Sequence, residues 1–234
     1  MKNKFEIRDS SEQLIFSCND FIECYDFWGT NCEDWFAFIG VSEQNINLIM
    51  DEETYSIKSD QFADRFHHEF TVQKIIKSHD VLYAGLYFSE GMYKRGALAL
   101  LKTVNALEER VWLDMKGNLK LIYLSACYLK NGFPRTLDKD TIVIEGKYIQ
   151  DYYAFFCELG YAFLGKFGYM GWNMDGISDL LTDLVRKDRT VNIIWKDSDL
   201  AFKAIENTVP EGYYQSSSSY ILMTLKEYCN VILE

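Results

Sequence analysis

Three aspartates spaced four residues apart are the feature of this sequence most suggestive of chemistry. Asp175, Asp179 and Asp183 lie on one face of any helix that contains them. The opposite face is apolar, with Met174, Ile177, Leu180, Leu181 and Leu184. Like charges at this spacing destabilise a helix by about 0.2–0.5 kcal/mol per pair, and only Asp175, in the first turn, gains from the helix dipole. The pattern fits either a solvated helix face or a ridge that docks onto a partner's Lys, Arg and His side chains.

A metal or nucleophile site is the alternative use of acidic, His and Cys residues. A carboxylate metal site at the aspartate row lacks a His or a second carboxylate helix to close it. The histidines are His67, His68 and His79, and a zinc site could combine them with Cys18, Cys24 and Cys32. However, the sequence has no Cys-x2-Cys pair, which zinc sites commonly use. We therefore expect no metal and no cofactor. A Cys–His nucleophile stays open, although no Gly-Cys or Cys-Gly elbow appears.

Charge and composition narrow the classes of partner. The net charge of −11 argues against nucleic acid or an anionic membrane as the main partner and favours a cationic partner or simple solubility. No uncharged apolar run of about 18 residues and no signal-peptide pattern is present. The six cysteines are scattered through apolar surroundings, as expected for free buried thiols in a reducing cytoplasm.

A glycine-rich segment with aromatic residues precedes the aspartate row. Residues 165–173 read Gly-Lys-Phe-Gly-Tyr-Met-Gly-Trp-Asn, without the spacing or the Lys-Ser/Thr ending of a phosphate-binding loop. Asn173 is a good N-cap for the helix that carries the aspartates. Tyr169 and Trp172 suit a protein interface, because Tyr and Trp are favoured anchors there.

Residues 140–234 alternate short apolar runs with helical patterns. We expect strands over 141–145, 191–195 and 230–233. Helices are expected from about 149 to 164, from Asn173 to Leu184, over 198–207 and over 217–228. This order predicts an α/β module in which a small parallel sheet is packed with helices.

The preceding part, 1–136, is expected to be a β-rich α+β domain of unknown role. The boundary is placed near Lys130–Arg135, where Gly132 and Pro134 occur together. Two hairpins are predicted, one pairing Phe5–Ile7 with Leu14–Phe16 and one pairing Val111–Met115 with Leu119–Leu124 through a Lys-Gly-Asn turn. Tyr55–Ile76 and Lys94–Leu107 show helical spacings, and Trp28, Trp35, Phe36 and Phe38 are expected core residues.

The segment from Gly168 to Leu181, Gly-Tyr-Met-Gly-Trp-Asn-Met-Asp-Gly-Ile-Ser-Asp-Leu-Leu, resembles the signature of barstar-family ribonuclease inhibitors. The order of elements over 140–234 is also similar, which implies a barstar-like three-stranded parallel sheet. By position, the resemblance makes Tyr169 the loop aromatic over the nuclease site, and Asp175 and Asp179 the helix carboxylates, the second at the place of a substrate phosphate. It gives Gly171 and Asn173 structural roles, as tight turn and helix cap, and matches Glu227 to an acidic residue near the last helix. Asp183 has no family role.

Two departures from the family pattern bear on the target. Ser178 stands where barstar has Trp, and Met170 replaces a second Tyr. The fold is expected to be unaffected, whereas the class of target could change.

These observations lead us to expect a non-enzymatic inhibitor, an immunity protein that occludes a basic ribonuclease toxin through the acidic helix and the aromatic loop. Its interface residues would be Tyr169, Trp172, Asp175, Asp179, Asp183 and Glu227. Two rivals remain at this point. One is an enzyme whose active site lies in the N-terminal half, with the acidic module for docking. The other is a binding module for a partner that is not a nuclease.

Overall fold

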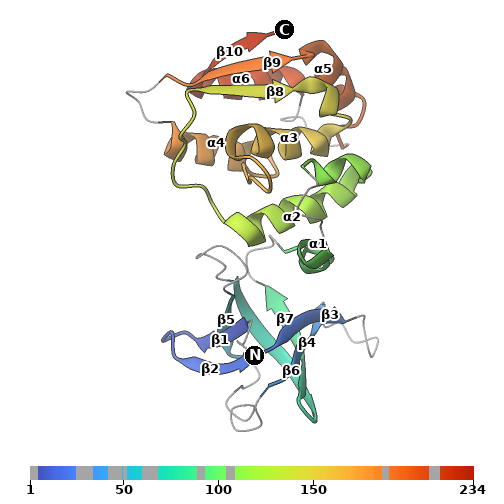
Figure 1. Cartoon of the computed structure of the whole chain (residues 1–234), viewed down its shortest axis with the longest axis vertical. Coiled ribbons are helices and arrows are strands. Elements are labelled where there is room, and N and C mark those ends of the chain that lie inside the picture. Colours follow the sequence, from blue (N-terminus) through green and yellow to red (C-terminus); the bar gives the residue numbers. More distant parts are fainter. Residues whose placement is uncertain are drawn as a thin grey trace. The chain divides into compact units, whose positions relative to one another are not determined.

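The protein forms two units, Met1–Lys102 and Thr103–Glu234 (Figure 1). A computed structural model of the chain describes residues 5–24, 34–41, 49, 52–59, 68–88, 93–103, 109–185, 190–210 and 217–234.

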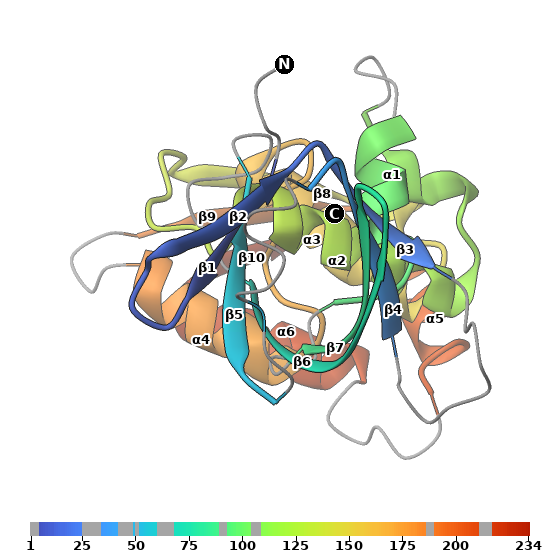
Figure 2. The same ribbon diagram turned by 90° about the horizontal axis from the view of Figure 1, so that it is seen from below.

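An antiparallel sheet makes up most of the first unit. Over the described residues its strand order is β2-β1-β5-β6-β7-β4-β3. The strands are β1 (Phe5–Asp9), β2 (Leu14–Cys18), β3 (Asp20–Cys24), β4 (Asp34–Ile39), β5 (Thr54–Lys58), β6 (His68–Ser78) and β7 (Val81–Phe88). Figure 2 shows β6 and β7 bending strongly along their length, and their register shifts between Val72 and Lys74. Such a bulge increases local bending and twist.

Phenylalanine rings fill the interior of this sheet. Phe21 stacks on Phe36 with ring centroids 4.8 Å apart, and Phe16 meets Phe38 edge-on at 5.4 Å. Trp35, Phe36 and Phe38 are all buried, as expected from the sequence, whereas Trp28 lies outside the described residues. Helix α1 (Ala97–Thr103) is fixed to β3 because Lys102 pairs with Asp20 at 2.6 Å.

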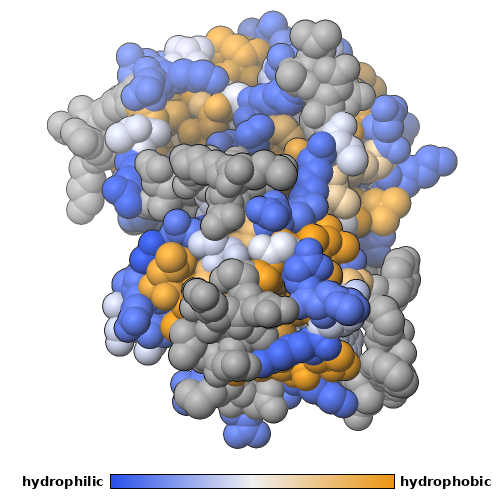
Figure 3. All heavy atoms as spheres, turned by 60° about the horizontal axis from the view of Figure 1, so that its bottom comes forward, coloured by the Kyte–Doolittle hydropathy of each residue, from blue (hydrophilic) through white to orange (hydrophobic). Residues whose placement is uncertain are grey.

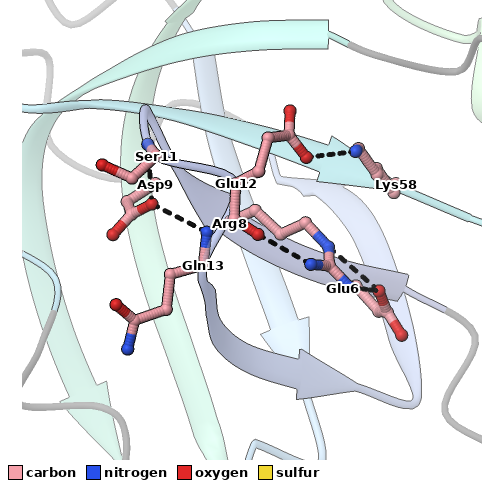
Figure 4. Close-up of polar contacts among 7 residues, drawn as sticks. All are labelled: Glu6, Arg8, Asp9, Ser11, Glu12, Gln13 and Lys58. Carbon is pink, nitrogen blue, oxygen red and sulfur yellow. Dashed lines mark hydrogen bonds and ion pairs between the residues drawn. The ribbon is translucent and has the colours of Figure 1, made fainter.

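Charged side chains around the β1–β2 turn bind the turn backbone or an opposite charge. Asp9 accepts hydrogen bonds from the backbone of Ser11 and Gln13, both at 2.9 Å, and Arg8 pairs with Glu6 at 2.7 Å (Figure 4). On the face shown in Figure 3, hydrophobic patches are interspersed with hydrophilic residues.

The N-terminal predictions had mixed outcomes. The hairpin of β1 and β2 is confirmed by antiparallel pairing of Ile7 with Phe16. The helical interpretation of Tyr55–Ile76 is wrong where the structure describes it, because β5 and β6 pair there as strands. The Lys94–Leu107 prediction is met in part by α1, although 104–108 lie outside the described residues.

The second unit contains a parallel sheet with strand order β10-β9-β8, as the sequence predicted. Its strands are β8 (Thr141–Glu145), β9 (Asn192–Lys196) and β10 (Asn230–Leu233). The buried face carries Ile142, Ile144, Ile193 and Trp195. Trp195 stacks on Phe155 with ring centroids 5.7 Å apart, so aromatic packing joins the sheet to the first helix after β8.

Helices connect these strands at the predicted places. They are α3 (Tyr152–Leu164), α4 (Met174–Leu184), α5 (Ser198–Glu206) and α6 (Ser218–Tyr228). Asp151 caps α3 by accepting a hydrogen bond from Ala154, and Ser217 caps α6. Within this unit, Figure 1 shows α3 and α4 below the sheet and a further helix, α2 (Lys120–Asn131), below them.

The second predicted hairpin is wrong. Val111–Asp114 and Gly117–Leu119 form short 3-10 helices (η2 and η3), and Lys120 begins α2. Trp112 is fully buried, with its ring 5.1 Å from Tyr123 and 5.7 Å from Tyr161 of α3. Packing against α3 therefore determines the structure of this segment.

The observed division also differs from the predicted boundary at 136–140. Lys120, whose side chain is only 1% exposed, pairs with Asp151 at 2.7 Å. Asn131 donates a hydrogen bond to the Phe167 carbonyl at 2.9 Å. Both contacts join α2 to the module that follows it, so residues 103–139 fold with the second unit.

Candidate functional site

The acidic face of α4, made of Asp175, Asp179 and Asp183, is exposed to solvent. The helix anchors itself by the opposite side, where Ile177 and Leu181 are fully buried. Within the described part of the chain, no Lys, Arg or His forms an ion pair with these aspartates. Their charge is therefore available to a partner.

Two residues fix the start of α4. The side chain of Asn173 accepts a hydrogen bond from the Gly176 backbone at 2.8 Å, which confirms the predicted cap. Gly171 has φ of +92°, and a Cβ there would lie 3.0 Å from the backbone of Gly176 and Ile177. Only glycine fits this turn, so the loop end and the first helical turn are held together.

Hydroxyl groups join α4 to α6. The Ser178 and Tyr228 side-chain oxygens are 2.8 Å apart, and Thr182 Oγ1 lies 3.2 Å from the same Tyr228 oxygen. Ser178 and Thr182 each precede an aspartate of the acidic face. The position of α6 is thereby tied to the edge of that face.

Comparison with protein families identifies this module. Residues 140–209 match the family model described as Barstar (barnase inhibitor). The C-terminal part of the chain is a barstar-like domain. Searches of curated proteins and of solved structures found no match. The printed description of this family is that of a barnase inhibitor, so the domain is similar to ribonuclease inhibitors.

One expected interface residue of the barstar-like domain is not displayed. The side chain of Tyr169 is 2% exposed, and its ring lies 5.3 Å from Tyr128 and 6.0 Å from Phe133. Burial raises the pKa of the Tyr169 phenol above its ordinary value. The interpretation of Tyr169 as a surface aromatic therefore needs correction, because α2 and the residue two positions after it cover the ring.

The other expected interface residues lie at the surface. Trp172 is partly exposed, and Glu227 is exposed on α6. Glu227 borders a shallow hollow lined also by Ser219, Leu222, Met223 and Lys226. Since Tyr228 contacts α4, the acidic residue beside it belongs to a helix that neighbours the acidic face.

The thiols of the described residues are poorly suited to nucleophilic chemistry. Cys18, Cys127, Cys157 and Cys229 are buried, and Cys24 is partly buried. Burial raises the pKa of Cys18 to about 12 and that of Cys229 to about 11, which keeps both protonated at neutral pH. Cys32 and His67 lie outside the described residues.

Metal binding and membrane insertion have no structural support in the described regions. No group of three or more His, Cys, Asp or Glu there is arranged to hold a metal ion. None of the helices seen in those regions has the length and apolar character needed to span a bilayer.

Two residues that contact the barstar-like domain were not singled out from the sequence. Phe133 is 44% exposed beside Tyr169, and Arg110 pairs with Glu158 of α3. Neither belongs to the signature segment, and both come from the region assigned to the preceding domain. Both would have been candidates if the second unit had been predicted to begin at Thr103 and not at about 140.

Proposed function

We propose that the barstar-like domain inhibits a basic ribonuclease by placing the acidic face of α4 in the nuclease's phosphate-binding cleft. The single observation that carries this proposal is the exposed, internally unneutralised row of Asp175, Asp179 and Asp183 on a helix fixed at its start by a cap and a glycine turn. Successive aspartates rise by about 6 Å along the helix axis, so the face presents regularly spaced negative charge.

Electrostatics would assist both encounter and specificity. The chain carries a net charge of −11, and a ribonuclease cleft that binds RNA phosphates is cationic. Complementary potentials increase association rates, and that increase falls as salt is added. Trp172 and Glu227 would extend the contact on either side of the acidic face.

The biological role that fits this mechanism is immunity. A cell that secretes a ribonuclease toxin needs an inhibitor inside the cell, and we propose that this protein acts there as a non-enzymatic immunity protein. In the first unit, Cys18 is buried, and burial raises the pKa of its thiol to about 12, so this thiol is a poor nucleophile at neutral pH.

Inhibition of barnase provides the direct test, with a fluorogenic RNA substrate and calorimetry for affinity. We expect stoichiometric loss of ribonuclease activity with the wild-type protein. Asp179→Ala should weaken binding by about 2–5 kcal/mol, the range for truncating one partner of a buried charge pair, which derives in part from the barnase–barstar complex itself.

Asp183→Ala is the matched control, because it removes the same group from the same exposed face. We expect it to cost less than about 1 kcal/mol, as for a rim charge, with an unchanged circular dichroism spectrum. Undiminished barnase activity with excess wild-type protein would overturn the proposed function. Equal losses for both variants would overturn the placement of Asp179 at the phosphate position.

A further inference from the structure

At the signature loop, the exposed aromatic side chain is Phe133, from the segment after α2, and not Tyr169 of the loop itself. Tyr169 is buried beneath Tyr128 and Phe133, and these two rings meet each other edge-on with centroids 4.9 Å apart. Phe133 forms the outer layer of this three-ring cluster, since 44% of it is exposed whereas 2% of Tyr169 is. A large aromatic side chain is therefore presented at the surface directly over the loop that leads into α4.

We infer that Phe133 is a partner-contacting residue, and that its ring occupies the base-binding surface of the ribonuclease while the acidic face of α4 occupies the phosphate site. This inference rests on the proposed function. RNA-binding proteins hold single-stranded bases by stacking them on aromatic rings or Arg guanidinium planes, next to cations that bind the phosphates. A planar apolar ring resembles a base, and fixed carboxylates resemble phosphates, so the two together resemble a bound nucleotide.

The backbone around Phe133 is fixed by its neighbours, while 44% of the residue stays exposed. Gly132 ends α2 with φ of +60° and donates a backbone hydrogen bond to the Tyr128 carbonyl at 2.7 Å. Asn131 is tied to the Phe167 carbonyl, and Pro134 follows with its restricted φ. A ring held by such neighbours loses little conformational entropy when a partner covers it, which favours a contact role.

The loop over 165–173 connects the position of Phe133 to the start of α4. Tyr169, under Phe133, is two residues from Gly171, whose backbone packs against Gly176 and Ile177 in the first turn of α4. The connection from α2 to β8 can be followed in Figure 1. Phe133 thus contacts the loop at Tyr169, and Asp175 lies in the first turn of the helix that this loop leads into.

The test is calorimetric binding of full-length variants to barnase. We expect Phe133→Ala to weaken binding at least tenfold, and Phe133→Tyr, which keeps a planar ring, to bind within about twofold of wild type. Leu119→Ala is the matched control, because Leu119 is 52% exposed at the other end of α2. It should leave affinity unchanged.

A folding defect is separated from a binding defect by Phe133→Leu. This variant retains apolar packing on Tyr128 and Tyr169 but lacks a planar ring, so we expect an unchanged melting temperature and weakened binding. If Phe133→Ala binds as well as wild type while Asp179→Ala binds weakly, the inference is overturned and the proposed function stands. If wild type itself does not bind barnase, both are overturned together.

Discussion

Arg110 and Glu158 form an ion pair at the heart of the second unit, with Arg110 Nε 2.8 Å from Glu158 Oε2 and a second bond of 3.1 Å. The Glu158 side chain has no exposed surface. The Arg110 guanidinium lies 4.1 Å from the ring centroid of Tyr148 and 4.2 Å from that of Tyr161. A residue preceding the signature region by about 60 positions thus neutralises a buried charge inside the barstar-like domain.

Removal of Arg110 should therefore destabilise the second unit. Arg110→Ala leaves the Glu158 carboxylate buried without its cation, which costs about 3–5 kcal/mol at neutral pH. The measurement is urea unfolding of the full chain, followed by helical circular dichroism. Arg135→Ala, at an exposed site in the same unit, is the control and should have little effect.

The pH dependence of this loss has a definite sign. Burial raises the pKa of Glu158 above its ordinary value even though Arg110 opposes the shift. A raised pKa in the folded state means that stability falls as pH rises through it. Without Arg110 the pKa rises further, so the deficit of Arg110→Ala should be smallest at about pH 4 and grow toward about pH 8. A deficit that shrinks with rising pH would contradict this account.

Loss of the Tyr228 hydroxyl should weaken the α4–α6 contact. Tyr228→Phe removes the hydrogen bond to Ser178 and the contact with Thr182, at a cost of about 1 kcal/mol. Ser178→Ala and the double variant complete a cycle, measured by urea unfolding. We expect the double variant to lose less than the sum of the single losses, and strict additivity would show that the two hydroxyls do not interact.

The signature region was the part of this molecule that sequence could predict well, because its determinants are local. The cap at Asn173, the apolar stripe of α4 and the order of elements after 140 all depend on residues within a few positions of one another. The Val111–Leu124 segment was mispredicted for the opposite reason. Its apolar pattern and Gly117 turn suit a hairpin, but burial of Trp112 against Tyr161 outweighed that local preference.

The exposure of Tyr169 could not be predicted from the signature either. The ring is covered by Tyr128 and Phe133, which lie more than thirty positions earlier in the sequence. No pattern within 165–173 records what packs on that segment. The burial of Tyr169 and the exposure of Phe133 therefore depend on tertiary packing between distant segments.

Substitution of Gly171 should disturb the start of α4 more than substitution of a similar glycine nearby. Gly165 also has a positive φ, +82°, but a Cβ there would meet nothing within 4 Å. Gly165→Ala therefore costs only backbone strain, about 1–3 kcal/mol. Gly171→Ala adds close contacts with Gly176 and Ile177, so its loss on urea unfolding should be larger. Equal losses would argue that the helix start shifts freely to make room.

The backbones of α3 and the signature loop approach each other closely at two glycines. A Cβ on Gly160 would come within 2.2 Å of the Gly168 carbonyl oxygen, and one on Gly168 within 2.1 Å of the Gly160 oxygen. Because the two backbones pack this closely, the loop has little room to change conformation when a target binds. Recognition by this surface would then follow a lock-and-key course, in which the free protein already holds its bound shape and discriminates among nucleases by fit rather than by adaptation.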